Sequence, residues 1–137
     1  MKKHFKTILI AGVIVALALW RFLASDGVGG SGEALADVKV PELTAAETAG
    51  KAVFDANCAK CHGDNAAGKD GFAPPLVHRI YEPNHHADIA FQRAAQLGVR
   101  AHHWTFGNMP PVEGVSAEDV SQIVTYVRAL QRANGIN

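Results

Sequence analysis

The chain has 137 residues, which is room for one domain of about 100 residues and a tail. Its 13 basic side chains equal its 13 acidic ones, so the charge balance gives no support for nucleic acid as a partner. The two cysteines could in principle form a disulfide. Their spacing, and the histidine that follows them, favour a different chemistry.

The first 25 residues are predicted to form an export segment. Three lysines precede an unbroken apolar run of 13 residues, Ile8 to Trp20, which is the layout of a signal sequence. By the positive-inside rule the lysines stay in the cytoplasm. Everything after residue 25 is therefore expected on the periplasmic side.

Two fates are open for this segment. A helix of 13 residues spans about 20 Å, less than the hydrocarbon core, and the late small-x-small sequence Ala34-Leu35-Ala36 would permit cleavage. If Arg21 extends toward the headgroups, however, the apolar stretch continues to Ala24 and reaches the lower limit for a spanning helix. We expect residues 7–24 to remain as an anchor in the inner membrane, whereas cleavage would release a periplasmic protein.

The rest of the chain divides into a linker and one domain. Residues 26–43 mix glycine with serine and acidic residues, a composition that stays flexible and does not bury a core. Residues 44–137 are predicted to form the folded domain. In that domain Thr44 and Glu47 form a capping box that opens a helix from about residue 45 to Cys58.

Two more helices are expected further along. Residues 88–97 are predicted to form a short helix that ends at Gly98, and a second capping box at Ser116 opens a helix to about residue 132. No alternating β-branched run occurs in the chain, so the fold class is all-α, with three to four short helices and long loops. A domain this small needs an added apolar centre to be stable.

Cys58, Cys61 and His62 form a CxxCH motif. At this spacing two thiols can add to the vinyl groups on one edge of a porphyrin while the next imidazole reaches the iron. A redox dithiol would need a βαβ context, and a zinc site would need a second ligand pair at short spacing. The motif therefore predicts one haem c, bound covalently through both cysteines, with His62 as an iron ligand.

Met109 is the candidate for the sixth position of the iron. Apart from Met1 it is the only methionine, and it lies in a loop instead of on the apolar helical face where a core methionine is usual. The proline after it favours an extended backbone, and Gly107 allows a close approach of the loop. Ligation by His62 and Met109 would give a positive reduction potential, because a thioether favours ferrous iron. A methionine that only fills the core is the alternative.

These features resemble the class I cytochromes c over residues 44–132. Gly50 and Phe54 precede Cys58 at the spacing of that family, and Ile123 and Tyr126 match the aliphatic and aromatic pair of its last helix. The resemblance implies the cytochrome c fold, in which the first and last helices cross at these residues.

The resemblance also implies roles for three other residues. The run Ala73-Pro74-Pro75-Leu76 is similar to the family's Gly-Pro-x-Leu, with alanine in place of the glycine. The Pro74 carbonyl would accept a hydrogen bond from His62 and orient it, and Leu76 would pack on the porphyrin. Trp104 is expected to lie against the haem or a propionate, with a plain packing role as the alternative.

Four of the seven histidines come as adjacent pairs, His85 with His86 and His102 with His103. The first interpretation is surface or loop packing, because neighbouring helical residues do not share a face. In a second interpretation His102 or His103 replaces Met109 on the iron, which would lower the potential. A third is copper handling, since imidazole and thioether are both copper ligands.

The leading functional hypothesis is a single-electron carrier, not an enzyme, whose partners are a redox donor and a redox acceptor. A fixed haem subunit of a larger membrane oxidoreductase is the alternative. A peroxidase-like or ligand-binding haem would need an open iron position and a distal acid-base group, such as His102 or His103.

Overall fold

The computed structural model describes residues 14–17 and 30–137 of the chain. Residues 14–17 are helical, and the rest of the predicted export segment lies outside the described residues. Among the described residues, no helix combines the length and apolar character needed to cross a membrane. From residue 30 onward the helical elements are α2 (Ala45–Asn57), α3 (Ala59–His62), η1 (Asp64–Ala66), η2 (Arg79–Tyr81), α4 (Asp88–Leu97) and α5 (Ala117–Ala133). Two isolated β-bridges, Lys69–Ala73 and Val99–Met109, are the extended pairings within residues 30–137.

The two longest helices begin at the predicted capping boxes. The Thr44 hydroxyl accepts a hydrogen bond from the Glu47 N–H at 3.3 Å, and the Glu47 carboxylate accepts one from the Thr44 N–H at 2.9 Å. Ser116 and Asp119 repeat the arrangement at 3.1 and 2.9 Å. These reciprocal bonds satisfy N–H groups that a helix start leaves without partners. The predicted starts of α2 and α5 are therefore confirmed, as is the short helix α4.

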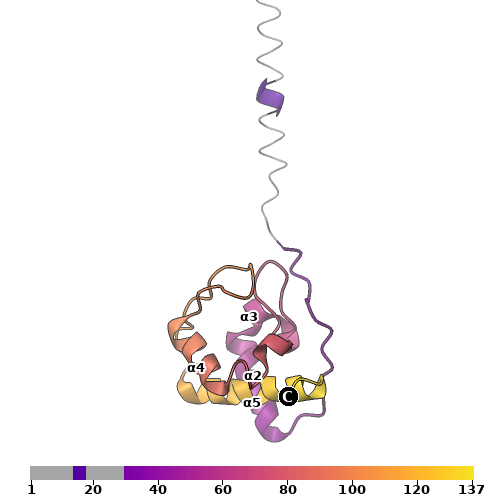
Figure 1. The fold of residues 1–137 in the computed structure, drawn as a ribbon, viewed down its shortest axis with the longest axis vertical. Helices are drawn as coiled ribbons and strands as arrows, with labels where there is room; N and C mark the ends of the chain where they lie inside the picture. Colours follow the sequence, from indigo (N-terminus) through magenta and orange to yellow (C-terminus); the bar gives the residue numbers. More distant parts are fainter. Residues whose placement is uncertain (1–13, 18–29) are drawn as a thin grey trace, which may run out of the picture.

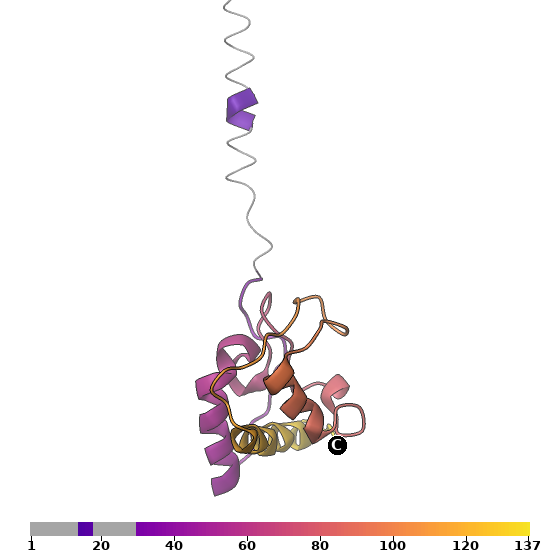
Figure 2. The ribbon, with the colours of Figure 1, turned by 90° about the vertical axis from the view of Figure 1, so that its left-hand side faces the viewer.

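The core of the domain is the crossing of α2 and α5, which meet at a steep angle (Figure 2). Gly50 lies at the closest approach, where an added Cβ would be 2.1 Å from the Gln122 carbonyl oxygen. The Phe54 and Tyr126 rings are both fully buried there, with centroids 5.7 Å apart and planes at 58°. Ile123 belongs to the same apolar cluster. This is the contact that the resemblance implied.

The loops that carry the candidate site lie at the other end of the domain from α5 (Figure 1). In that view α3 and part of the α4–α5 connection are both at this end, and the ribbons in Figure 2 agree. The crossing of α2 and α5 thus forms the base of the domain, and the loops pack above it.

Two polar side chains of α5 are buried beneath these loops. The sequence analysis did not predict their burial. Arg128 is 8% exposed and donates hydrogen bonds to the carbonyls of Tyr81 at 2.6 Å and His86 at 2.5 Å. Gln131 is 1% exposed and donates to the Leu76 carbonyl at 2.8 Å. Buried polar groups are tolerated when they are bonded in this way. These two side chains hold the connection at residues 76–86 against α5.

The second half of the predicted linker lies along the domain. The N–H groups of Leu35 and Ala36 donate to the Ala67 carbonyl at 3.1 and 3.0 Å. Lys39 is bonded through its backbone N–H and carbonyl to the Asn134 side chain at 3.0 and 2.9 Å. The glycine-rich composition suggested a free tether, but in the described part of this segment the backbone finds partners on the domain surface. The domain boundary at residue 44 stays a prediction.

Candidate functional site

The CxxCH motif lies where α2 ends and the single turn of α3 begins. The Cys58 N–H donates to the Phe54 carbonyl at 2.7 Å, and the Cys58 carbonyl accepts from Cys61 at 3.1 Å and from His62 at 2.9 Å. The three site residues therefore stand on one short helical turn, and α2 fixes its start. Because the Phe54 side chain of α2 packs against α5 in the core, this hydrogen bond connects the motif directly to the core.

The environment of the two cysteines is unlike that of a redox dithiol. Cys58 is half-buried and Cys61 exposed. Burial, with a smaller effect from Cys61, raises the pKa of the Cys58 thiol to about 11. A CxxC oxidoreductase needs a thiol with a lowered pKa. The raised pKa of Cys58 therefore argues against the dithiol interpretation.

The His62 imidazole is held by one hydrogen bond to the backbone. Its Nδ1 lies 2.9 Å from the Pro74 carbonyl oxygen, and a carbonyl can only accept, so Nδ1 carries the proton and Nε2 keeps its lone pair. Burial lowers the pKa of His62, against a smaller opposing effect of the bond to Pro74. The ring is therefore neutral and oriented, which is the form that binds a metal. These residues fit an iron porphyrin.

The loop after the motif places Pro74 beside His62 and buries Leu76 in the core. The Leu76 N–H donates to the Ala66 carbonyl at 2.9 Å, while its own carbonyl accepts from Gln131. Leu76 is 9% exposed and packs in the core cluster. The expected hydrogen bond between Pro74 and His62 is present, and the contact of Leu76 with the porphyrin stays a prediction.

Met109 is held in an extended bridge with Val99. Each N–H donates to the carbonyl of the other residue at 2.9 Å. The close backbone approach occurs at Gly98, where φ is +73° and an added Cβ would be 2.5 Å from the Met109 carbonyl oxygen. At Gly107 φ is +89°, which favours glycine, and an added Cβ would meet no atom of the described residues within 4 Å. The close approach predicted for this loop stays a prediction. The backbone of Met109 is thus held in place, and its role as sixth ligand stays a prediction.

Trp104 carries a buried polar atom without a partner. Its ring meets His78 edge-on at 5.1 Å and stacks on Phe106 at 5.9 Å. Burial raises the pKa of the Tyr81 phenol, and the nearby Trp104 indole N–H opposes this effect slightly. The same N–H reaches no acceptor at hydrogen-bonding geometry among the described residues. An unsatisfied buried N–H is costly. A haem carries two carboxylates, and one of these would satisfy the indole.

Two cysteines on one helical turn, followed by an imidazole held by a backbone carbonyl, fit the attachment of a haem, so the fold and site define a c-type haem protein. Residues 47–131 match the sequence profile of the cytochrome c family, and the chain belongs to that family. Its cofactor is haem c, an iron porphyrin bound covalently, and Cys58 and Cys61 are the two cysteines of the sequence.

A curated relative is the Cbb3-type cytochrome c oxidase subunit FixP of Bradyrhizobium diazoefficiens. It is 35% identical over 131 residues, which are 88% of this chain and 43% of the relative. The chain thus spans less than half the length of the relative that it matches. No solved structure matches the chain.

Sequence reasoning missed Arg128 and Gln131, which position the site through the loops that they hold. A signal was available, because both residues follow buried apolar positions of α5 at helical spacing, four residues after Val124 and Val127. A polar residue on such a stripe indicates a buried hydrogen-bond network.

Proposed function

We propose that the domain carries single electrons through a haem c whose iron is bound by His62 and Met109. The observation that carries the proposal is the bond from His62 Nδ1 to the Pro74 carbonyl, which leaves Nε2 free and the ring oriented. The haem supplies the redox couple. The protein residues would hold the haem through Cys58 and Cys61 and keep the His62 imidazole neutral and oriented.

The support for Met109 is its restraint. Paired hydrogen bonds to Val99 hold its backbone, and the glycine before that bridge permits the close approach. A thioether carried on a backbone that is held in this way can remain bound in both oxidation states of the iron, so that little reorganisation accompanies electron transfer. A thioether ligand raises the reduction potential, whereas a histidine in its place would lower it.

The test is an absorption spectrum of the oxidised, haem-loaded protein. We expect the weak red band of a methionine-ligated ferric haem in the wild type and its loss in Met109→Ala. His102→Gln and His103→Asn are the matched controls and keep the band. Loss of the band in either histidine variant, or its absence from the wild type, would contradict the proposal.

Peroxidase-like or ligand-binding chemistry is separated by adding cyanide. The proposed ligand pair leaves no open iron position, so we expect slow cyanide binding in the wild type and fast binding in Met109→Ala. Fast binding by the wild type would indicate an open iron, which suits ligand binding better than electron transfer.

A second candidate is a haem subunit of a larger oxidoreductase. The observation that favours it is the similarity to a protein named as an oxidase subunit. Native electrophoresis of gently solubilised membranes, stained for haem, distinguishes the two. A free carrier migrates near the 14.6 kDa of the chain, and a subunit migrates with a larger complex.

We further propose that the domain works on the periplasmic side of the inner membrane, tethered by residues 7–24. Ile14, Val15 and Leu17 are 61%, 61% and 52% exposed, as expected for side chains that face lipid. The mass of the mature protein tests this, because an intact N-terminus in the membrane fraction supports the anchor. A soluble, shortened protein supports a cleaved signal.

A further inference from the structure

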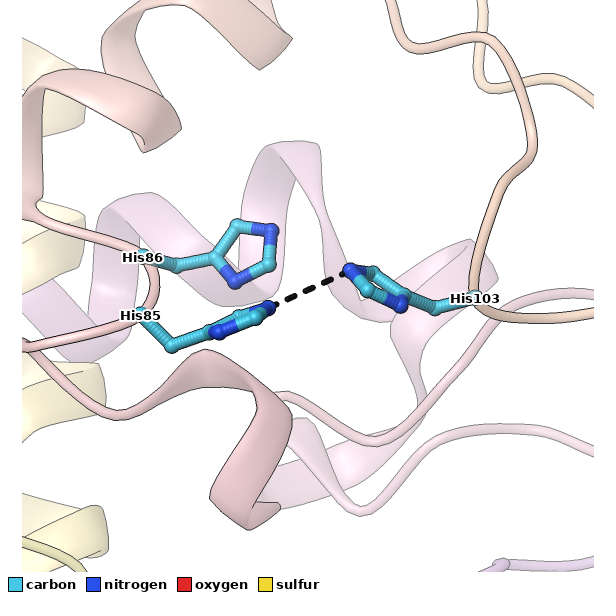
Figure 3. A group of neighbouring side chains, drawn as sticks. All are labelled: His85, His86 and His103. Carbon is cyan, nitrogen blue, oxygen red and sulfur yellow. Dashed lines mark hydrogen bonds between the residues drawn. The ribbon is translucent and has the colours of Figure 1, made fainter.

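Four histidines that the electron-carrier function leaves unused come together in the fold. His85 and His86 lie on the turn before α4, and His102 and His103 lie on the loop after it. Figure 3 shows the rings of His85 and His86 pointing across the gap toward His103. One ring nitrogen from each of these three residues lies within 4.8 Å of the others.

We propose that this histidine cluster (His85, His86 and His103, with His102 beside them) binds a divalent transition-metal ion of the zinc and copper class. His85 Nε2 and His103 Nε2 are 3.4 Å apart. Two imidazole nitrogens bound to one tetrahedral zinc ion are about 3.3 Å apart, given a zinc–nitrogen distance of about 2.0–2.1 Å. The observed spacing is thus already that of one edge of a metal site.

The tautomers support metal binding. His86 Nδ1 donates to the Ile80 carbonyl at 2.6 Å, and His102 Nδ1 donates to the Arg100 carbonyl at 2.8 Å. Each bond leaves Nε2 with its lone pair, and histidines that bind metals usually have their other nitrogen held in this way. The Pro74 carbonyl holds Nδ1 of His62 in the same way.

The charge of the cluster points the same way. Partial loss of hydration beside the neighbouring rings, followed by the repulsion of His102, His85 and His86, lowers the pKa of the exposed His103. None of the ion pairs within residues 30–137 includes one of the four histidines. The lowered pKa favours the neutral form of the His103 ring, and neutral imidazole is the form that takes up zinc or copper.

The two halves of the cluster are held in place before any ion arrives. The N–H groups of His85 and His86 donate to the Glu82 carbonyl at 3.0 and 2.8 Å, and buried Arg128 donates to the His86 carbonyl. On the facing loop, the Ala101 N–H donates to the Asn108 side chain at 2.9 Å. Because these two loops are already held in place, little binding free energy is lost in ordering them when an ion binds.

The cluster is also open to solvent, since His85 and His103 are exposed and His86 half-buried. Three protein nitrogens leave a fourth position for His102 or for water. A bound ion would join the turn at residues 82–86 to the loop that leads to Trp104 and Met109. The proposal does not rest on the ligands of the haem iron, because the cluster shares no residue with them.

The test is calorimetric titration of untagged, haem-loaded, chelator-treated protein with zinc sulfate and, separately, copper sulfate. We expect one ion per chain, with copper tighter than zinc as in the Irving–Williams order. His85→Gln and His103→Asn each lower the affinity about tenfold or more, and Lys51→Gln, on α2 and outside the cluster, leaves it unchanged. X-ray absorption at the zinc edge should show imidazole nitrogens at about 2.0 Å.

Three outcomes would overturn the proposal: no binding of either ion, equal binding by the cluster variants and the wild type, or a zinc spectrum without imidazole. The visible spectrum of each variant keeps the two proposals apart. If His103→Asn loses the red band as well as the metal, His103 is an iron ligand and both proposals fail. If the band is retained while binding is lost, the metal site stands by itself.

Discussion

Replacing Arg128 with methionine removes the buried cation that holds the loops to α5. Its guanidinium donates to the carbonyls of Tyr81 and His86, to Gln131 Oε1 at 2.6 Å, and to Asp88 at 2.9 Å. The Asp88 carboxylate is 70% exposed and can return to water, and the Tyr81 carbonyl keeps a bond from Gln131 at 3.1 Å. Two acceptors are left without partners, at about 1.5–3 kcal/mol for each bond to a charged donor. We expect the free energy of unfolding to fall by about 3 kcal/mol, the lower end for two such bonds. The loss stays at this end because the methionine side chain replaces the packing of the aliphatic stem of arginine.

Guanidinium unfolding of the haem-loaded protein measures this loss, provided the slope with denaturant is unchanged. Arg132→Met is the matched control on the same helix. Its guanidinium is 57% exposed and pairs with Glu47 at 3.2 Å, so its removal should cost less than about 1 kcal/mol. If the two variants are equally stable, the Arg128 network does not hold the fold as described.

Two further perturbations test the α2–α5 crossing and the helix caps. Gly50→Ala should destabilise the protein by more than about 2 kcal/mol in the same unfolding assay, because the new methyl group meets the backbone of α5. The control is Ala49→Gly on the exposed face of α2, which should cost about 1 kcal/mol. Stabilisation by Gly50→Ala would show that the helices can move apart. Hydrogen bonds from the Thr44 backbone and then its side chain lower the pKa of Glu47. A carboxyl with a lowered folded pKa stabilises the fold above its unfolded pKa, and this contribution is lost as the pH falls. The stability gap between wild type and Glu47→Gln should therefore narrow between about pH 6 and pH 3, and a constant gap would contradict the capping role.

The helices could be predicted because their signals are local. The capping box at Thr44 and the glycine at Gly98 each act within one turn, and both mark the observed ends. The CxxCH motif is local as well, so its attachment chemistry could be argued from three residues. Pro74 was found only through resemblance, since its bond to His62 joins residues 12 positions apart and has no signature in composition.

The rest depends on the path of the long loops. The two histidine pairs were visible in the sequence, but their meeting requires the chain to turn back at Gly98 and pair at Val99 with Met109. Arg128 likewise contacts segments more than 40 residues away along the chain. Periodicity predicts which face of a helix is buried, whereas it does not say which loop crosses that face.

The central claim is that the domain carries one electron at a time on a haem held by His62 and Met109, and a potentiometric titration tests it most directly. The account predicts a single one-electron curve with a positive midpoint potential for the wild type and a markedly lower midpoint for Met109→His. A negative midpoint in the wild type, or a midpoint that the substitution leaves unchanged, would contradict it.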